Sequence, residues 1–344
     1  MSTDSAHLDF RPLGVAVVGL GMVGKDHADI LHALPEVQLL VTADIDPQRA
    51  AVAPPEVDFV TDPLVALERP GVEAVWICTP QHLHRDLVVA ALERGLHVFC
   101  EKPLASTLAD ADAMIEAAAR APGVLAVGHT LRFHPDYRAA HRAVASGQVG
   151  EPVHLAARWN TGDHEGRIIS GRTTVPLEMA IHDIDILRWI AGEVTEVYAT
   201  ASTITPCGSG PDAVVGTLRF ASGAVAALEH NWIMPFDTGM RSDHRLAVFG
   251  TKGSAYVELR QTPTQVFGTA GSSFPNSTYR PPDLDVPAGA LATADRHFVQ
   301  TVRAGLPWPL GLDDARAALA IALAMDRSIA QGRPIRLDEP EELA

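Results

Sequence analysis

Three glycines near the start of the chain constrain its fold more than any other feature. Gly19, Gly21 and Gly24 form the pattern Gly-x-Gly-x-x-Gly, directly after an apolar run at residues 15–18 and before a segment with helical spacing. In this context the first glycine permits a tight turn, the second lets a pyrophosphate approach the backbone, and the third lets helix and strand pack closely. The pattern therefore predicts a strand–turn–helix unit whose helix N-terminus faces the phosphates of a dinucleotide.

A carboxylate at the end of the second apolar run extends this pattern. Asp44 lies 20 residues after Gly24, where a carboxylate accepts hydrogen bonds from the adenine ribose hydroxyls. The same charge repels a 2′-phosphate, and no cation directly follows it, since the nearest is Arg49. We therefore expect NAD as the cofactor in preference to NADP, with Met22 and Val23 of the glycine turn also against it.

The first 130 residues alternate apolar runs with helix-like segments. Unbroken apolar runs of this length are typical of strands buried on both faces of a parallel sheet. The runs lie at residues 15–18, 37–43, 74–78, 97–100 and 124–127, and the main helical segments at 23–34, 83–93 and 107–120. This alternation predicts an α/β domain over residues 1–130, with the doubly wound parallel sheet of the Rossmann fold.

The pattern changes after about residue 150. Gly-containing loops join the strand runs, which favours antiparallel neighbours. Strand runs lie at 153–159, 214–220, 224–232, 245–249 and 254–259, and helical segments at 177–191, 292–304 and 313–330. We therefore predict an α+β domain over residues 131–344, with a mostly antiparallel open sheet. Residues 261–290 are rich in Gly, Pro, Ser and Thr and are expected to form a long loop, as a lid or subunit contact.

Length and charge narrow the functional classes. A chain of 344 residues with 47% hydrophobic residues is folded and long enough for two cores. Its net charge of −15 repels phosphate backbones and anionic lipid, so we expect neither nucleic acid nor a membrane as a partner. No run approaches the length of a membrane span, the start lacks an apolar signal segment, and three cysteines make no disulfide framework. These features predict a cytoplasmic protein.

Two further segments carry side chains suited to catalysis. Glu101 and Lys102 follow the run at 97–100, and carboxyl ends of strands in such sheets face the ligand crevice. A lysine there can hold a substrate hydroxyl or relay a proton, although a lysine after a strand is also a common solvated surface group.

The second segment is the predicted helix at 177–191. Glu178, His182 and Asp185 are spaced i, i+4 and i+7, so a helix places them on one face, while most other positions are apolar. Two carboxylates and a histidine on a buried helix are costly unless they pair or line a cavity. A satisfied core histidine is the alternative, but the grouping favours a site.

Together these motifs resemble the glucose–fructose oxidoreductase, inositol dehydrogenase and rhizopine-catabolism family, Gfo/Idh/MocA. The resemblance covers nearly the whole chain, residues 14–334. The segment around His182 resembles the inositol dehydrogenase branch of the family in particular. It is carried by the glycine turn with Asp44, the Thr-Pro-Gln-His-Leu-His stretch at 79–84, Glu101-Lys102-Pro103, and Ala-Ile-His-Asp-Ile-Asp at 180–185.

The resemblance implies roles for individual residues. Lys102 matches the lysine of the family's Glu-Lys-Pro motif, and His182 matches its catalytic histidine. Glu178 stands where inositol dehydrogenases typically carry Asp, which keeps the charge on a longer side chain. Near the cofactor the resemblance places Thr79, Pro80, His82, Glu101 and Lys102. The residues expected at the substrate are Lys102, Arg132, Asn160, Glu178, His182 and Asp185.

The implied activity is NAD(H)-dependent oxidation of a secondary alcohol on a sugar or inositol-like cyclitol. His182 acts as the general base, Lys102 holds the reacting oxygen, and Glu178 or Asp185 orients a neighbouring group. The alternatives are an NAD-dependent glycoside hydrolase on the same scaffold and a non-catalytic NAD-binding sensor, and Lys102 counts against both. No His-Glu-x-x-His or Cys-x-x-Cys pattern occurs, so no metal is expected. The resemblance also implies that the domain over residues 131–344 binds the substrate and joins subunits into a homodimer or homotetramer.

Overall fold

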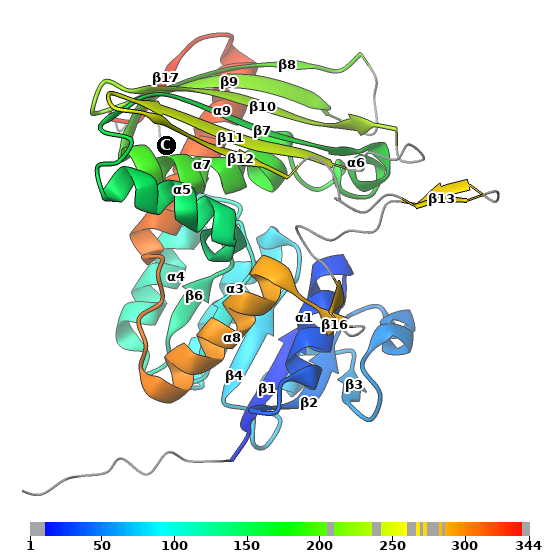
Figure 1. Ribbon diagram of the computed structural model, residues 1–344. Coiled ribbons are helices and arrows are strands. Elements are labelled where there is room, and N and C mark those ends of the chain that lie inside the picture. Colours follow the sequence, from blue (N-terminus) through cyan, green and yellow to red (C-terminus); the bar gives the residue numbers. More distant parts are fainter. Residues whose placement is uncertain are drawn as a thin grey trace, which may run out of the picture.

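The described part of the chain forms two large β-sheets with helices between and around them. The computed structural model describes residues 11–204, 210–235, 242–259, 266–268, 271–273, 282–283 and 286–338. In the view of Figure 1 the second sheet lies above the first, and helices α5 (Pro135–Ala145) and α7 (Ile181–Ala191) lie below the second sheet on the side of the first.

The first sheet is parallel throughout, with the order β3-β2-β1-β4-β5-β6. Its order reverses beside β1, as in doubly wound sheets that bind dinucleotides at that point. The strands are β1 (Leu13–Val18), β2 (Val37–Ala43), β3 (Asp58–Val60), β4 (Ala74–Ile77), β5 (His97–Cys100) and β6 (Leu125–Val127). The prediction of a Rossmann-type sheet is confirmed, and the short edge strand β3 was not predicted.

The connecting helices follow local signals. Thr107 caps α4 (Leu108–Arg120) by accepting a hydrogen bond from the Asp110 N–H, and Pro35 follows the end of α1 (Met22–Ala33). The others are α2 (Pro63–Leu67), α3 (His84–Glu93), η1 (Pro47–Val52), η2 (Gln81–Leu83) and η3 (Thr130–Phe133).

A helix from the C-terminal part of the chain covers the first sheet beside α1. This helix, α8 (Gly289–Ala304), packs Phe298 against Trp76 of β4 with ring centroids 5.2 Å apart, and against Phe99 of β5 at 5.7 Å. By its packing α8 therefore belongs with the first sheet, although it follows the second in sequence. The domain division at residue 130 remains a prediction.

The second sheet has the order β12-β11-β7-β10-β9-β8-β17, and only the β7–β10 pair among these neighbours is parallel. This confirms a mostly antiparallel sheet with the two predicted hairpins. The strands are β7 (Pro152–Gly162), β8 (Val194–Ser202), β9 (Ala213–Phe220), β10 (Val225–Met234), β11 (Ser242–Gly250), β12 (Ser254–Glu258) and β17 (Ile335–Arg336). The sequence pattern did not reveal β8.

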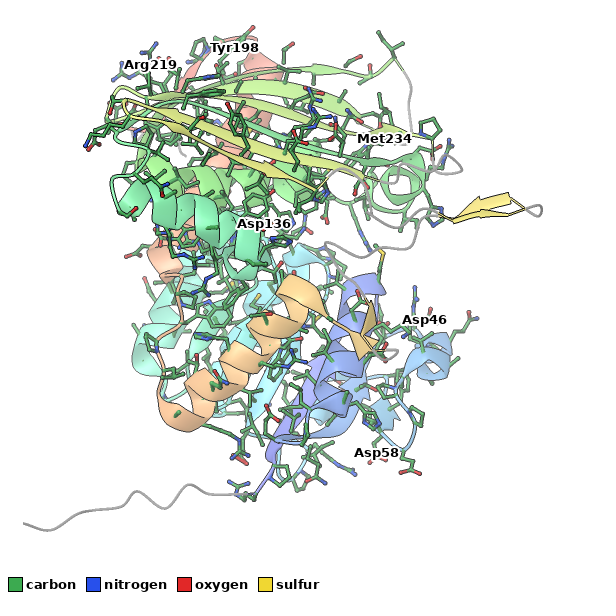
Figure 2. The ribbon with its side chains drawn as sticks, in the orientation of Figure 1. Asp46, Asp58, Asp136, Tyr198, Arg219 and Met234 are labelled. Atoms are coloured by element: carbon green, nitrogen blue, oxygen red, sulfur yellow. The ribbon has the colours of Figure 1, made fainter. Side chains whose placement is uncertain are left out.

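One face of this sheet packs on helices and the other is open. Burial alternates along β9 and β10, as expected when successive side chains point to opposite faces. Helices α7 and α9 (Leu312–Gln331) form the covered core, and α6 (Asp163–Ile169) lies at the end of β7 and β10. Tyr198 and Arg219 lie on the opposite, uncovered face (Figure 2).

The predicted helix at 177–191 differs from a single α-helix. Its first turn, η4 (Pro176–Ala180), is a π-helical turn, and α7 begins only at Ile181. Such wider turns often occur at functional sites, and they change which side chains share a face.

Most of the predicted loop at 261–290 lies outside the described residues. The described pieces include two short strand pairs and the first residues of α8. These strands are β13 (Val266–Gly268) with β14 (Gly271–Ser273), and β15 (Pro282–Asp283) with β16 (Val286–Pro287). The lid or subunit-contact role therefore remains a prediction.

The close packing of β1 and α1 at Gly24 yields a stability test. A Cβ at Gly24 would lie 1.8 Å from the Gly19 carbonyl oxygen, whereas a Cβ at Gly21 meets nothing within 4 Å. Gly24→Ala should therefore lower the free energy of unfolding by about 1–3 kcal/mol or more, measured by urea denaturation. Gly21→Ala is the matched control and should change it by less than about 0.5 kcal/mol. Equal stabilities of the two variants would contradict this packing.

Candidate functional site

The glycine turn is open where a ligand phosphate would approach. Gly19 has φ +92°, and a Cβ there would lie 2.8 Å from backbone atoms of Cys78 and Thr79. Gly21, at the N-terminus of α1, has open space in the direction of a Cβ, so a ligand can approach its backbone. Met22 is 60% exposed beside it, and Val23 is half-buried.

Asp44 lies at the end of β2, next to this turn. Its Oδ2 accepts a hydrogen bond from the Leu20 N–H at 2.7 Å, and its Oδ1 accepts one from the Asp46 N–H at 3.0 Å. These two contacts fix the carboxylate beside the glycine turn while leaving lone pairs for ligand hydroxyls. The geometry fits the predicted ribose contact.

The segment after β4 places a further polar group beside the turn. The Thr79 hydroxyl oxygen is buried and has no hydrogen-bond partner in the described part of the chain, so it is available to a ligand. His84 is buried, and its ring connects the carbonyl oxygens of Thr79 (Nε2, 2.8 Å) and Pro103 (Nδ1, 3.0 Å). The Thr79-Pro80 segment is thereby fixed to the segment after β5, whereas His82 is exposed. Together with Asp44 and Gly21, these groups fit a dinucleotide.

Lys102 and Glu178 are brought together from the two halves of the chain. Lys102 follows β5, and its ammonium group donates to the Glu178 backbone oxygen at 3.0 Å and to its Oε1 at 2.9 Å. Only 9% of the Lys102 side chain is exposed, against 31% of the Glu178 side chain. The pair therefore combines a largely buried ammonium group with a carboxylate side chain that is partly exposed to solvent.

His182 lies on α7, one turn after Glu178, with 7% of its surface exposed. Its ring packs against Trp159 of β7 with centroids 4.5 Å apart, and Trp159 in turn packs on His244 of β11 at 4.0 Å. The neighbouring Asp183 contacts His230 of β10 through Oδ2 and Nε2, 2.9 Å apart. These contacts fix the orientation of α7 against the second sheet.

Arg132 and Asp185 bind each other in the interior. The guanidinium of Arg132 donates to Asp185 through Nη2 at 2.7 Å and through Nε at 2.9 Å, and both residues are buried. Its charged group also lies 5.2 Å from the ring centre of Trp189. Both residues were predicted to contact the substrate, and the structure instead shows them bound to each other.

Asn160 does not lie with the other residues that were predicted to contact the substrate. On β7 it follows Trp159, so its side chain points to the opposite face of the sheet. There its amide donates to Glu229 Oε1 at 3.2 Å. The predicted substrate contact of Asn160 has no support from this placement.

Sequence reasoning missed His129, which directly follows β6. The residue is buried, its Nδ1 lies 3.9 Å from Asp185 Oδ2, and neither ring nitrogen has a hydrogen-bond partner in the described residues. Burial lowers the pKa of His129 below its usual range, so the ring is neutral.

His27 and Asp295 were also missed, although a signal for them exists. Both are ionisable residues on otherwise apolar helix faces, on α1 and α8 respectively. His27 connects Asp295 with Glu101, the residue before Lys102. An isolated charge in an apolar helical stripe requires a partner, so the pattern could have identified both residues.

Two other kinds of feature are absent from the described residues. No cluster of three or more His, Cys, Asp or Glu side chains is arranged to hold a metal ion. Among the same residues, no helix combines the length and apolar character required to cross a bilayer.

Comparisons with known proteins agree with the geometry. Residues 13–129 match the sequence model of an oxidoreductase family with an NAD-binding Rossmann fold, and residues 137–256 match the GFO/IDH/MocA C-terminal domain. Myo-inositol 2-dehydrogenase from Thermotoga maritima is 30% identical, over 94% of this chain and 98% of its own length. The scyllo-inositol 2-dehydrogenase (NAD(+)) of Bacillus subtilis is also 30% identical, over 94% of this chain and 96% of its own.

The fold also matches solved structures. The crystal structure of myo-inositol 2-dehydrogenase from Lactobacillus plantarum superposes with a TM-score of 0.83 at 23% identity, and the match covers 95% of this chain and 99% of that one. At this identity the likeness shows a shared fold. The sequence matches along both halves of the chain go further, and they show that it belongs to the Gfo/Idh/MocA family of NAD-dependent oxidoreductases acting on CH–OH groups.

Proposed function

We propose that this enzyme oxidises a secondary hydroxyl of an inositol-like cyclitol or a sugar, in a reaction that runs in either direction. The observation that carries the proposal is the contact of the Lys102 ammonium with the backbone oxygen and Oε1 of Glu178, one turn before His182. The relatives named as inositol 2-dehydrogenases support a cyclitol as the first substrate to test.

Lys102 binds the reacting oxygen. An ammonium group has three N–H donors, and in the described part of the chain Glu178 accepts from two of them. The third donor is available to a substrate oxygen. Because little of the side chain is exposed, its charge is weakly screened and stabilises negative charge that develops on that oxygen.

His182 removes the hydroxyl proton as the general base. Histidine is the side chain best suited to proton exchange near neutral pH. Packing against Trp159 holds the ring in one orientation, and the Asp183 contact with His230 holds the helix that carries it. Lys102 contacts Glu178, which precedes His182 by one turn, so we expect the ammonium group and the base to act on the same hydroxyl.

Bound NAD⁺ supplies the acceptor for the hydride that leaves the same carbon as its hydroxyl becomes a carbonyl. The residues that would hold it are Gly21 and Thr79 at the phosphates and Asp44 at the adenine ribose. The ion pair between Arg132 and Asp185 holds α7 in place.

The cysteines bear on where the enzyme is located. Cys78 and Cys100 are free thiols, which supports a reducing, cytoplasmic location.

An absorbance assay at 340 nm tests the activity with NAD⁺ and a panel of inositols, aldoses and sugar acids. His182→Ala should reduce kcat about 10²–10⁴-fold, because the base is lost. Lys102→Met should reduce it about 10²–10³-fold, because charge on the oxygen is no longer stabilised.

The matched controls are His32→Ala and Lys252→Met, at exposed positions, which should keep wild-type rates. Turnover that survives both site substitutions would refute these roles. Bound NAD without turnover of any polyol would instead favour the glycoside hydrolase or sensor alternatives.

Cofactor preference is tested at Asp44 by fluorescence titration with NADH and NADPH. Asp44→Ser should weaken NADH binding about 10- to 100-fold through the loss of hydrogen bonds from ribose hydroxyls to a charged acceptor. NADPH binding should be unchanged or stronger, because the repulsion of its 2′-phosphate is removed. Asp44→Asn retains an acceptor for the Leu20 N–H and separates the role of charge from that of the turn. Equal losses for both cofactors would contradict the ribose assignment.

We also propose a homodimer or homotetramer that buries the uncovered face of the second sheet. Apolar side chains are exposed on strands of this sheet, including Val215 at 54% and Tyr256 at 62%, and Figure 2 shows Tyr198 on the uncovered face. Val215→Arg should shift the mass measured by analytical ultracentrifugation to that of the monomer. Arg85→Glu, on exposed α3 of the first sheet, is the control. A wild-type monomer would refute the proposal.

A further inference from the structure

A buried histidine lies between two carboxylates behind the catalytic lysine. His27 of α1 and Asp295 of α8 have no exposed surface, and Glu101 is 7% exposed. The Nδ1 of His27 lies 2.8 Å from Asp295 Oδ1, and its Nε2 lies 3.0 Å from Glu101 Oε1. The Trp76 indole N–H also donates to Asp295 Oδ1 at 2.8 Å. His27, Asp295 and Glu101 are called the His27 triad below.

The geometry of the triad favours a charged imidazole. A neutral ring has a single N–H, so one of its nitrogens would face a carboxylate with no proton between them. Burial by itself lowers the pKa of His27, but the carboxylates of Asp295 and Glu101 outweigh it and raise the pKa from 6.5 to about 10. Among the described residues, the Trp76 indole also contacts Asp295, and the Phe99 ring lies 5.2 Å from the His27 ring. Burial and the same two carboxylates raise the pKa of the Cys78 thiol, so that it adds no charge beside the triad.

The triad reaches the catalytic lysine through the backbone. Glu101 Oε2 accepts a hydrogen bond from the Lys102 N–H at 3.1 Å, while Oε1 accepts from His27. Gly128 packs against the same carboxylate, since a Cβ at that position would lie 2.9 Å from Oε1. The carboxylate is therefore fixed on several sides. Lys102, the residue after Glu101, donates from its ammonium group to Glu178.

We propose that His27 is a positioning residue: as an imidazolium it holds Glu101, and through Glu101 it sets the backbone of Lys102 so that the ammonium group meets the substrate oxygen. Asp295 is the counterion that keeps His27 charged. The proposal rests on the proposed function for the role of Lys102, whereas the charge of His27 and the placement of Lys102 can be measured without turnover. An uncharged residue at position 27 leaves two buried carboxylates facing each other, which displaces Glu101 or protonates it.

The charge of His27 is tested first, by NMR of protein labelled with ¹³C at histidine Cε1. The resonance that disappears in His27→Gln should keep the chemical shift of an imidazolium from pH 6 to pH 9. In Asp295→Asn, an isosteric change, the same resonance should titrate at lower pH because one carboxylate is lost. A wild-type resonance that titrates near pH 6.5 would overturn the proposal.

The placement of Lys102 is tested by acetylation with an N-hydroxysuccinimide ester, followed by mass spectrometry. The chain contains three lysines, Lys25, Lys102 and Lys252, so each site is followed separately. In His27→Gln the rate at Lys102 should rise several-fold, while the rates at Lys25 and Lys252 stay unchanged. An unchanged rate at Lys102 would overturn the positioning role whatever the substrate is.

Kinetics then connect the triad with the reaction. His27→Gln should lower kcat about 10- to 100-fold, as expected for a displaced catalytic group, with little change in NADH affinity. His32→Gln, on the exposed side of the same helix, should have no effect. In Asp295→Asn, kcat should fall as the pH rises through the lowered pKa of His27, a profile that loss of packing alone does not produce.

Failures of the two proposals have different outcomes. A wild-type kcat in His27→Gln would overturn the positioning role, whereas no turnover of polyols by the wild-type enzyme would overturn the proposed function alone. Folding is followed by urea denaturation. Because folding raises the pKa of His27, its stabilisation is full below pH 6.5 and is lost as the pH rises to about 10. The stability difference between wild type and His27→Gln should therefore narrow over that window.

Discussion

The contact between Lys102 and Glu178 joins the two halves of the molecule at the point where chemistry is proposed. Lys102 follows β5 of the first sheet, and Glu178 belongs to η4, which leads into α7 beneath the second sheet. A change in the relative position of the sheets would separate the ammonium from its two acceptors. The remaining contacts around the site act as constraints that keep the Lys102 ammonium within hydrogen-bond distance of Glu178.

These constraints are mostly contacts between buried ionisable side chains. Arg132 with Asp185 and Asp183 with His230 hold α7, while the His27 triad holds the segment that carries Lys102. Buried ion pairs contribute little net stability, because desolvation offsets their attraction, but removing one partner is strongly destabilising. Such pairs therefore specify one arrangement of the helices more than they strengthen the fold.

Local patterns predicted much of the fold. The glycine turn, the five main parallel strands and both hairpins depend on residues within about ten positions of one another, so periodicity and turn residues revealed them. The π-helical turn at Pro176–Ala180 and the packing of α8 on the first sheet were not visible in this way. The packing of α8 depends on contacts between segments distant in sequence, as the Phe298 contact with Trp76 shows.

The sequence by itself determined the kind of chemistry: a dinucleotide turn, a carboxylate at the ribose position, and a lysine and histidine in motifs of one enzyme family. These features are local, because a phosphate turn and a strand end require particular residues at adjacent positions. Only the tertiary structure decided which groups meet. It paired Lys102 with Glu178, turned Asn160 to the far face, and placed His27 between two carboxylates. Side-chain partners depend on the packing of whole helices and sheets, and sequence spacing does not encode that packing directly.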